Sequence, residues 1–325
     1  MAFDSNQVTE LHAQLRTYLG AIVCSALEDE AVTDIKVGPD GLVWLTKHGE
    51  GDVCTGGFLP ESQRFAALNT MASLLGKHIN AEVSRLSGEL PLTGDRIQGF
   101  VPPTSPPAIY IRCHAPEVFT FANYIEKGIL LPWQVEVIRK HVQKRSAIGF
   151  SGSTGSGKTT LLNTTLMELV DSNEHVVVLQ DTKEIKCKAP NFSELQTSEE
   201  VSLQQLVMDS MRMKPDRIII GEVRDAAGLE VLKALQTGHK GGMFTVHSDS
   251  AMGVFERFAQ FCQEAGVPPQ WRLMQSTIGL IVHMEMTPKG RRVTEIKEVV
   301  NENTVDQIPI RLKELRPQQA VALTH

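Results

Sequence analysis

The spacing of hydrophobic positions changes about halfway along the chain. From about residue 146 onward, short apolar strands alternate with helices, which is the pattern of a parallel α/β sheet. The first 115 residues carry helix and strand signals without that regular alternation. The change predicts a smaller α+β domain at residues 1–115, a linker at 116–132 and an α/β domain at 133–325.

The N-terminal region begins with an apolar stripe at helical spacing, made of Val8, Leu11, Leu15, Tyr18, Leu19 and Ile22. A Gly-Pro-Asp-Gly turn at 38–41 then separates two strand-like segments, and a second helical pattern runs from Glu61 to about His78. Strands are expected near 96–101 and 108–113. The first stripe is compatible with a membrane surface, but helices with this spacing more often pack in a core.

The C-terminal region shows helix signals first and then the alternation. Thr120 is suited to cap a short helix ending at Gly128, and Pro132 is suited to start the next helix. Apolar runs then predict strands near 146–150, 175–181, 217–221, 242–246 and 280–285. Helices are expected between them, near 158–170, 202–214, 226–237 and 249–265.

Composition narrows the possible classes of protein. The chain has 325 residues and a formal net charge of −6 with a pI near 6.0, so it lacks the overall basicity of a free-standing nucleic-acid binder. Its five cysteines form no C-x-x-C pair, which argues for a reducing compartment and against a zinc ribbon. No apolar run approaches the roughly 18 residues of a membrane span, and no signal peptide is evident. The chain is therefore expected in the cytoplasm, with any membrane association peripheral.

One segment carries the clearest chemistry. Residues 152–159 fit the G-x-x-x-x-G-K-[ST] phosphate loop at every position, with Gly152, Ser153, Thr154, Gly155, Ser156, Gly157, Lys158 and Thr159. The glycines let backbone N–H groups point at phosphates, Lys158 reaches the β- and γ-phosphate oxygens, and the Thr159 hydroxyl suits Mg²⁺. Thr160 follows in the predicted helix, whose N-terminal dipole favours phosphate. The segment predicts binding of ATP with Mg²⁺.

Candidate residues for hydrolysis follow three other predicted strands. Glu222 comes directly after an apolar strand and a glycine, and is the candidate general base. Asp181 and Glu184 follow a second strand and are candidates to hold Mg²⁺ through water, although acids also cap turns at such places. His247 ends a third strand and is a candidate γ-phosphate sensor, with a purely structural histidine as the common alternative.

Four motifs occur in one order: the phosphate loop, an acidic box, the Gly-Glu pair at 221–222 and a Thr-Gly-His…Thr-Val-His box at 237–247. With the run Gly88–Pro103 and the segment Ile109–Arg112, they give the chain from about residue 25 to 300 a pattern that resembles the type II/IV secretion ATPase superfamily. Within it, the chain is most similar to conjugal-transfer and type IV secretion ATPases, with pilus retraction or assembly motors second. The tetracysteine module usual in type II motors is missing.

The resemblance implies a RecA-like P-loop NTPase core with a smaller α+β N-terminal domain, acting as an ATP hydrolase. It also implies a homohexameric ring, peripheral at the cytoplasmic face of the bacterial inner membrane, that contacts components of a secretion channel. ATP hydrolysis would drive conjugative pilus assembly or export of DNA or protein. Arg96 and Arg112 match family arginines that approach the nucleotide's phosphates. The family's acidic box has Glu-Asp where this chain has Gln180-Asp181, so Glu222 is expected to carry more of the chemistry.

Two other functions remain open. A nucleic-acid translocase could use a similar core, with a basic patch at Arg139, Lys140, Lys144 and Arg145, although a solvated helix face is the simpler explanation of these residues. No sequence-specific binding of nucleic acid is expected. A nucleotide-dependent assembly protein, which binds ATP without turning it over, would account for Gln180 in the acidic box.

Overall fold

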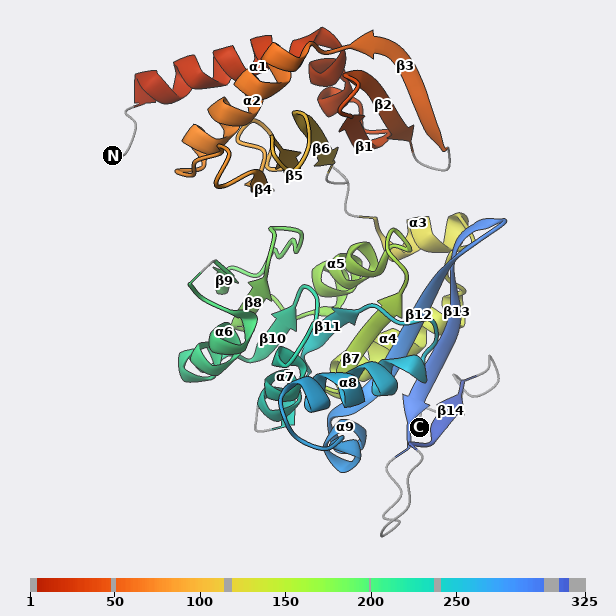
Figure 1. Cartoon of the computed structure of the whole chain (residues 1–325). Coiled ribbons are helices and arrows are strands. Elements are labelled where there is room, and N and C mark those ends of the chain that lie inside the picture. The colour runs from red at the N-terminus through yellow and green to blue at the C-terminus, as the bar shows by residue number, and fades with distance from the viewer. Residues whose placement is uncertain are drawn as a thin grey trace. The chain divides into compact units, whose positions relative to one another are not determined.

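The computed structural model describes residues 5–47, 51–113, 119–198, 200–236, 241–300 and 310–315. The chain forms two compact units, Met1–Glu117 and Val118–His325 (Figure 1). The first unit buries its apolar side chains in one cluster, and the second buries them in two.

The first unit is an antiparallel sheet with two helices packed on one face (Figure 1). Its elements are α1 (Ser5–Glu28), β1 (Val32–Val37), β2 (Leu42–Lys47), β3 (Asp52–Phe58), α2 (Glu61–Leu74), β4 (Arg85–Glu89), β5 (Arg96–Phe100) and β6 (Ala108–Arg112). The strands lie in the order β3-β2-β1-β6-β5-β4, and every neighbouring pair is antiparallel. The sequence predicted this α+β fold but missed β3 and β4.

Helix α1 bends at Gly20, and the bend changes which residues are buried. Gly20 has a φ of 74°, outside the helical range, and Leu15 and Leu19 before it are buried in the core. Beyond the bend Val23 is buried, whereas Ile22 is 44% exposed, so the prediction of Ile22 as a core position is wrong. Of the predicted stripe, Leu15, Tyr18 and Leu19 pack in the core cluster. Within the described residues, no helix is both long and apolar enough to cross a bilayer.

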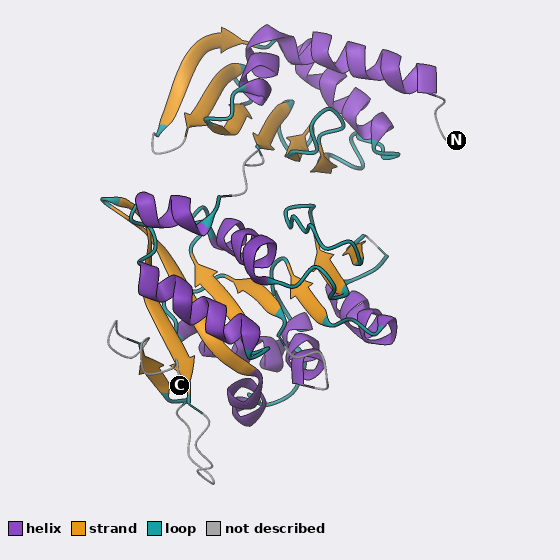
Figure 2. Ribbon diagram, turned by 180° about the vertical axis from the view of Figure 1, so that it is seen from behind, coloured by secondary structure: helices purple, strands orange, loops and turns teal. Residues whose placement is uncertain are grey.

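The second unit is a mixed sheet between two layers of helices. Its elements are α3 (Phe121–Glu126), α4 (Pro132–Gln143), β7 (Ala147–Gly152), α5 (Lys158–Leu169), β8 (Val176–Gln180), β9 (Phe192–Gln196), α6 (Leu203–Ser210), β10 (Arg217–Ile220), α7 (Ala227–Gln236), β11 (Met243–Val246), α8 (Gly253–Glu264), α9 (Trp271–Thr277), β12 (Ile278–Thr287), β13 (Gly290–Val299) and β14 (Leu312–Glu314). The strand order is β14-β13-β12-β7-β11-β10-β8-β9. The strands from β12 to β9 in this order pair in parallel, whereas β13 is antiparallel to β12 and β14 is antiparallel to β13. Helices α3 to α5 cover one face and α6 to α9 the other (Figures 1 and 2).

The parallel strands match the predicted ones, with ends shifted by a few residues, but β9, α9, β13 and β14 were missed. Strand β13 shows why. Val293 and Ile296 are three residues apart, an odd spacing that would place them on opposite faces of a regular strand. The pairing with β12 is irregular between them, and both side chains join the same core cluster. A bulge of this kind hides the period of two that marks a strand in sequence.

The predicted linker at 116–132 needs correction. Residues 116–118 lie outside the described residues, but the following residues belong to the second unit. Phe121, Tyr124 and Leu130 are buried in one of its core clusters. Thr120 caps α3, as predicted, by accepting the backbone N–H of Asn123. The chain from residue 119 onward is therefore packed structure and not a free connection.

A buried ion pair joins several elements at the amino end of β10. Arg217 is only 2% exposed and donates two hydrogen bonds to Glu174, from Nε at 2.5 Å and from Nη2 at 3.1 Å. It also donates to the carbonyl oxygens of Gly241 and Val142, at 2.9 and 3.2 Å. The buried guanidinium thus has both a charge partner and backbone acceptors, which burial of a charge requires.

We expect Arg217→Met to destabilise the second unit by about 3 kcal/mol, the lower end of the range for breaking a buried pair, because Arg145 still lies 3.3 Å from Glu174. Urea unfolding followed by tryptophan fluorescence measures the change. Arg212→Met is the matched control, since that arginine's side chain is 83% exposed, and it should change stability by about 0.5 kcal/mol or less. Equal midpoints for the two variants would contradict the role of the buried pair.

Candidate nucleotide site

The phosphate loop joins β7 to α5 in a conformation that needs its glycines. Gly152, Gly155 and Gly157 have φ values of 145°, 75° and 98°, which residues with side chains rarely adopt. A Cβ at Gly152 would lie 2.1 Å from the carbonyl oxygen of Met284 in β12. The loop is followed directly by the N-terminus of α5, so its backbone and the helix dipole are arranged as the sequence predicts for an anion site.

Two side chains of the loop are buried without a full set of partners. The hydroxyl of Ser156 is buried and has no hydrogen-bond partner within the described chain. Lys158 is also buried, and its Nζ donates to the carbonyl oxygen of Ser153 at 2.8 Å. Burial lowers the pKa of Lys158 to about 8, because the charged ammonium loses solvation, although Glu222 and Glu184 oppose the shift.

Side chains of β12 and β13 contact the phosphate loop and the residue before it. The Ser151 hydroxyl lies 2.9 Å from Nδ1 of the buried His283, within hydrogen-bond distance. Arg291 donates from Nε to the carbonyl oxygen of Gly155 at 2.9 Å. Sequence reasoning missed both His283 and Arg291. No local motif marks them, because they meet the loop only through the parallel pairing of β12 with β7.

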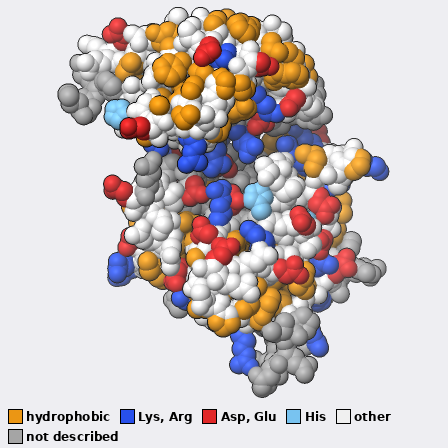
Figure 3. Space-filling model, in the orientation of Figure 1, with side chains coloured by type: hydrophobic (Ala, Val, Ile, Leu, Met, Phe, Trp, Pro, Cys, Tyr) orange, Lys and Arg blue, Asp and Glu red, His pale blue; other side chains and the backbone are white. Residues whose placement is uncertain are grey.

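Three predicted site residues meet at the carboxyl end of the sheet. Nζ of Lys158 lies 3.4 Å from Nδ1 of His247, and Nε2 of His247 lies 3.1 Å from Oε1 of Glu222. His247 follows β11 and Glu222 follows β10, neighbouring parallel strands that end at one edge. Acidic, basic and histidine side chains are visible together on one face of the second unit (Figure 3). The first half of the predicted histidine box, residues 237–240, lies outside the described residues.

Arg224 is a further member of this cluster that sequence reasoning missed. Its Nη2 donates to Oε2 of Glu222 at 2.6 Å, and its Nη1 lies 3.3 Å from Oδ2 of Asp181. Burial alone would raise the pKa of Glu222, but the hydrogen bonds from His247 and Arg224 outweigh it and lower that pKa to about 2. Both oxygens of Glu222 are therefore engaged. The only signal in the sequence was an arginine two residues beyond Glu222, in a segment that turns directly after its strand.

Gln180 has a structural role at the end of β8. Its side-chain oxygen accepts the backbone N–H groups of Glu184 and Ile185, at 3.0 and 2.9 Å. Its amide nitrogen donates to Oε1 of Glu194 at 2.6 Å. A glutamate at this position could accept the same two bonds, but it would bring two carboxylates into contact. The amide therefore shapes the turn that carries Asp181 and Glu184.

The candidate Mg²⁺ residues lie at the same edge of the sheet. Asp181 accepts a hydrogen bond from the Thr197 hydroxyl at 3.0 Å, in addition to its ion pair with Arg224. Thr159 and Thr160 stand half-buried in the first turn of α5. In the part of the chain that the structure describes, no group of three or more His, Cys, Asp and Glu side chains could hold a metal ion.

Arg96 and Arg112 are brought together in the first unit. They face each other in the antiparallel register of β5 and β6, so their side chains share one face of the sheet. Nε of Arg112 lies 3.3 Å from Oδ1 of Asp34, and the Arg112 side chain stays about half exposed. In the same register Glu89 stands opposite Arg96 and Asp34 opposite Arg112, so an acid lies next to each arginine on this face of the sheet.

The predicted basic patch is not a continuous cationic surface. Lys140 is buried, and Arg139 forms an i,i+3 ion pair with Glu136 at 3.5 Å. Arg145 lies within 4.0 Å of both Glu174 and Asp216. Lys144 is exposed, but the other three charges are buried or compensated by acids, so the patch is not the continuous cationic groove that backbone contacts with nucleic acid need.

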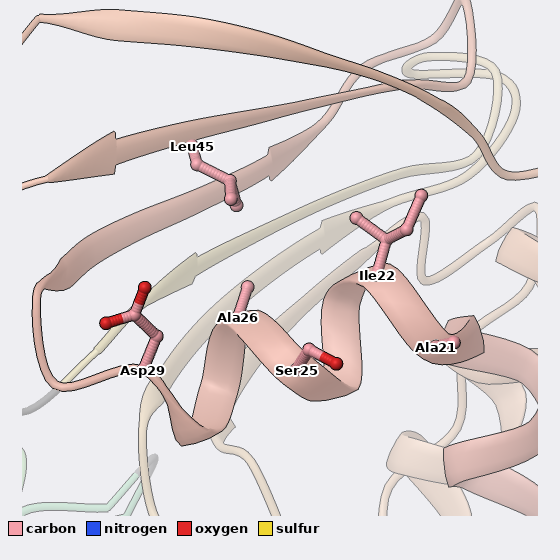
Figure 4. A pocket seen from close by; sticks show the side chains of 6 residues that line it. All are labelled: Ala21, Ile22, Ser25, Ala26, Asp29 and Leu45. Carbon is pink, nitrogen blue, oxygen red and sulfur yellow. The ribbon is translucent and has the colours of Figure 1, made fainter.

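A pocket of about 350 Å³ lies in the first unit between α1 and β2 (Figure 4). Its lining residues are Ala21, Ile22, Ser25, Ala26, Asp29 and Leu45. Asp29 is paired with Lys47 at 2.8 Å, and most of the remaining lining is apolar. The pocket includes none of the predicted site residues.

Comparisons with known proteins identify the family of this chain. A family model described as "Type II/IV secretion system protein" matches residues 96–311. A probable conjugal transfer protein TrbB of Sinorhizobium fredii is 38% identical over 289 residues, which cover 88% of this chain and 89% of the relative. The conjugal transfer protein TrbB of Rhizobium radiobacter is 38% identical over 286 residues, 87% of this chain and 88% of the relative. The chain belongs to the type II/IV secretion ATPase superfamily, as predicted.

Solved structures show the same fold. The ATPase DotB of Legionella pneumophila superposes with a TM-score of 0.61 at 20% identity, covering 86% of this chain and 80% of DotB. The pilus retraction motor PilT with bound ADP superposes with a TM-score of 0.59 at 20% identity, covering 85% of this chain and 80% of PilT. The predicted RecA-like core with a smaller N-terminal domain is confirmed.

Gln180→Glu should destabilise the second unit by about 1–3 kcal/mol, because it replaces a hydrogen bond to Glu194 by contact between two carboxylates. Urea unfolding at neutral pH measures the loss. Adding Glu194→Gln restores a donor and an acceptor at the contact, and should recover most of the stability. A double variant as unstable as the single one would contradict this account of Gln180.

Above neutral pH, we expect the protein to take up protons when it binds ATP. The pKa of Lys158 is about 8 without nucleotide, and a bound phosphate raises it, so at pH 8.5 most unprotonated Lys158 gains a proton on binding. Calorimetry in two buffers of different ionisation enthalpy should give an uptake of roughly half a proton or more at pH 8.5 and little at pH 7. Equal uptake at both pH values would contradict the lowered pKa.

Proposed function

We propose that this protein is an ATP hydrolase that acts as the motor of a type IV secretion system. One observation carries the proposal: Lys158 of the phosphate loop is connected through His247 to Glu222, a carboxylate beyond the end of a neighbouring strand. A phosphate-binding cation and a candidate base thus lie within one hydrogen-bonded chain, as hydrolysis of a phosphoanhydride requires.

The loop suits the phosphates of ATP. Residues 152–160 supply three glycines with positive φ, the N-terminus of α5 and the hydroxyl of Ser156, which is buried without a hydrogen-bond partner among the described residues. On binding, Lys158 exchanges the carbonyl oxygen of Ser153 for the β- and γ-phosphate oxygens. The phosphate oxygens then stabilise the charged ammonium of Lys158, which has lost solvation through burial.

The same edge suits Mg²⁺. Thr159 offers a hydroxyl, and Asp181 and Glu184 offer carboxylates, which are the oxygen donors that Mg²⁺ prefers. Only one or two protein carboxylates are usual, since the nucleotide and water supply the other ligands. When bound, the ion neutralises charge that develops on the phosphates.

Glu222 is the proposed acceptor of the proton from the attacking water. In the nucleotide-free state it is a weak base, because both its oxygens are engaged and its pKa is about 2. Arrival of the γ-phosphate draws Lys158 and His247 toward the new negative charge, which releases Oε1 of Glu222 for water. Arg96 and Arg112 are proposed to add positive charge at the phosphates, from the N-terminal domain of the same or a neighbouring subunit.

The conjugal-transfer relatives support the biological setting. We infer a homohexameric ring, peripheral at the cytoplasmic face of the bacterial inner membrane, which contacts components of a secretion channel. It would drive conjugative pilus assembly or export of DNA or protein. The hydrogen bonds of Gln180 account for this residue without a scaffold that binds ATP but does not hydrolyse it. Most charges of the basic patch are buried or compensated by acids, so they do not favour a nucleic-acid translocase.

Phosphate release with Mg²⁺, measured per subunit over a hundredfold dilution, tests the proposal. Glu222→Gln should bind ATP but lose turnover by about a hundredfold or more, whereas Lys158→Ala should lose binding and serves as the blank. Specific activity should fall on dilution and respond little to DNA. Turnover retained by Glu222→Gln would exclude it as the base, strong DNA stimulation independent of dilution would favour a translocase, and no activity above the blank would favour a scaffold.

A further inference from the structure

Arg224 lies among the acidic side chains that the proposed Mg²⁺ would approach. It is hydrogen-bonded to Glu222 and ion-paired with Asp181, and these two acids come from turns after different strands, β10 and β8. The pKa of Arg224 is raised, chiefly by the hydrogen bond to Glu222, and Asp181 and Glu184 add to the effect. One guanidinium therefore stands in the field of all three carboxylates.

The two bonded carboxylates need this positive charge. Their side chains are only 23% and 32% exposed, so water alone does not fully screen their mutual repulsion. Lys158 is not placed to do the same. Among the described residues, the hydrogen bonds of Lys158 go to Ser153 and His247 and not to a carboxylate.

The shape of the side chain matters as well as its charge. A guanidinium presents several N–H groups in one plane, so it can contact two carboxylates at once, which the compact ammonium of a lysine does less well. Arg224 uses Nη2 for Glu222 and Nη1 for Asp181, and so ties the two turns together. A divalent cation that approached these acids without nucleotide would have to compete with a charge already in contact with both.

Resting on the ATPase function proposed above, we propose that Arg224 is the internal counter-ion of the nucleotide-free site. It neutralises Glu222 and Asp181 until a divalent cation arrives together with ATP, and it keeps the cation from binding alone. The ion and the nucleotide then enter as one complex. Arg224 is a positioning residue in this scheme, because it acts through the two carboxylates and not on the reacting atoms.

Binding of Mn²⁺ to the nucleotide-free protein tests this inference directly. Mn²⁺ is the probe because its free concentration can be followed by electron paramagnetic resonance during a titration. The wild-type protein should bind Mn²⁺ weakly, and Arg224→Gln should bind it roughly tenfold more tightly, because one neighbouring positive charge is lost at a partly exposed site.

Lys183→Gln is the matched control for charge. Lys183 stands in the turn beside Asp181, and its side chain is exposed and lies 4.0 Å from Glu194. Its removal takes away the same charge from the neighbouring turn and should change Mn²⁺ affinity less than about twofold. A second control, Arg224→Gln combined with Glu222→Gln, should return the affinity toward the wild-type value if the ion binds at these acids.

Several outcomes would overturn the inference. They are an Arg224→Gln affinity equal to that of the wild type, an equal gain in Lys183→Gln, or a gain that the double variant keeps. If Arg224→Gln does not fold, Arg224→Lys replaces it and should still bind Mn²⁺ more tightly than the wild type. These titrations contain no ATP, so a result that contradicts the role of Arg224 does not contradict the ATPase proposal. Absence of ATP hydrolysis by the wild-type protein would contradict the ATPase proposal and would leave the Mn²⁺ result unchanged.

Discussion

The engagement of both oxygens of Glu222 is the interaction on which the rest of the site depends. Glu222, Asp181 and Glu184 lie at one edge of the sheet. Their charges need compensation, because partly buried carboxylates without partners destabilise the folded state. Here Arg224 takes one oxygen of Glu222 and His247 takes the other. Together with the ion pair of Arg224 and Asp181, these bonds connect the turns after β8, β10 and β11 to each other. Through Lys158 they also reach the phosphate loop.

This connection makes the loop and the candidate base one electrostatic unit. In the proposed mechanism, phosphate at the loop would change the partners of Lys158, which is bonded to the histidine that holds Glu222. Because hydrogen bonds in a partly buried network depend on one another, this change would extend to the candidate base. The weak basicity of Glu222 is a property of that network. It follows from the bonds and not from the sequence position of the glutamate.

Local constraints were predictable from the sequence, and contacts between distant strands were not. Gly152, Gly155 and Gly157 are identified by the backbone shape that any phosphate loop needs, and the structure has that shape. Gly221 is evident in the sequence as the glycine before Glu222, but the sequence does not show that a Cβ there would lie 3.0 Å from Cβ of Gln180 on the neighbouring strand. Arg291 could not be found in this way, because its contact with the loop is made across the sheet.

Gln180 shows a different limit of sequence reasoning. Taken alone, the change from the family's acid to an amide suggested lost chemistry. The structure shows that the amide has a donor where an acid has none, and that the donor meets Glu194. Whether a polar side chain is needed as a donor or as a charge depends on its neighbour, and Glu194 belongs to β9, a strand that the hydrophobic pattern did not reveal.

The paired arginines of the first unit extend the same electrostatic argument. Arg96 and Arg112 are directly opposite in adjacent strands, and the ion pair with Asp34 compensates Arg112. Glu89 stands opposite Arg96 on its other side, so an acid lies next to each arginine in this row across the sheet. The resemblance had suggested phosphate contact for each arginine separately. Because the two arginines share one face of the sheet, the proposed phosphate contact would be made by both together.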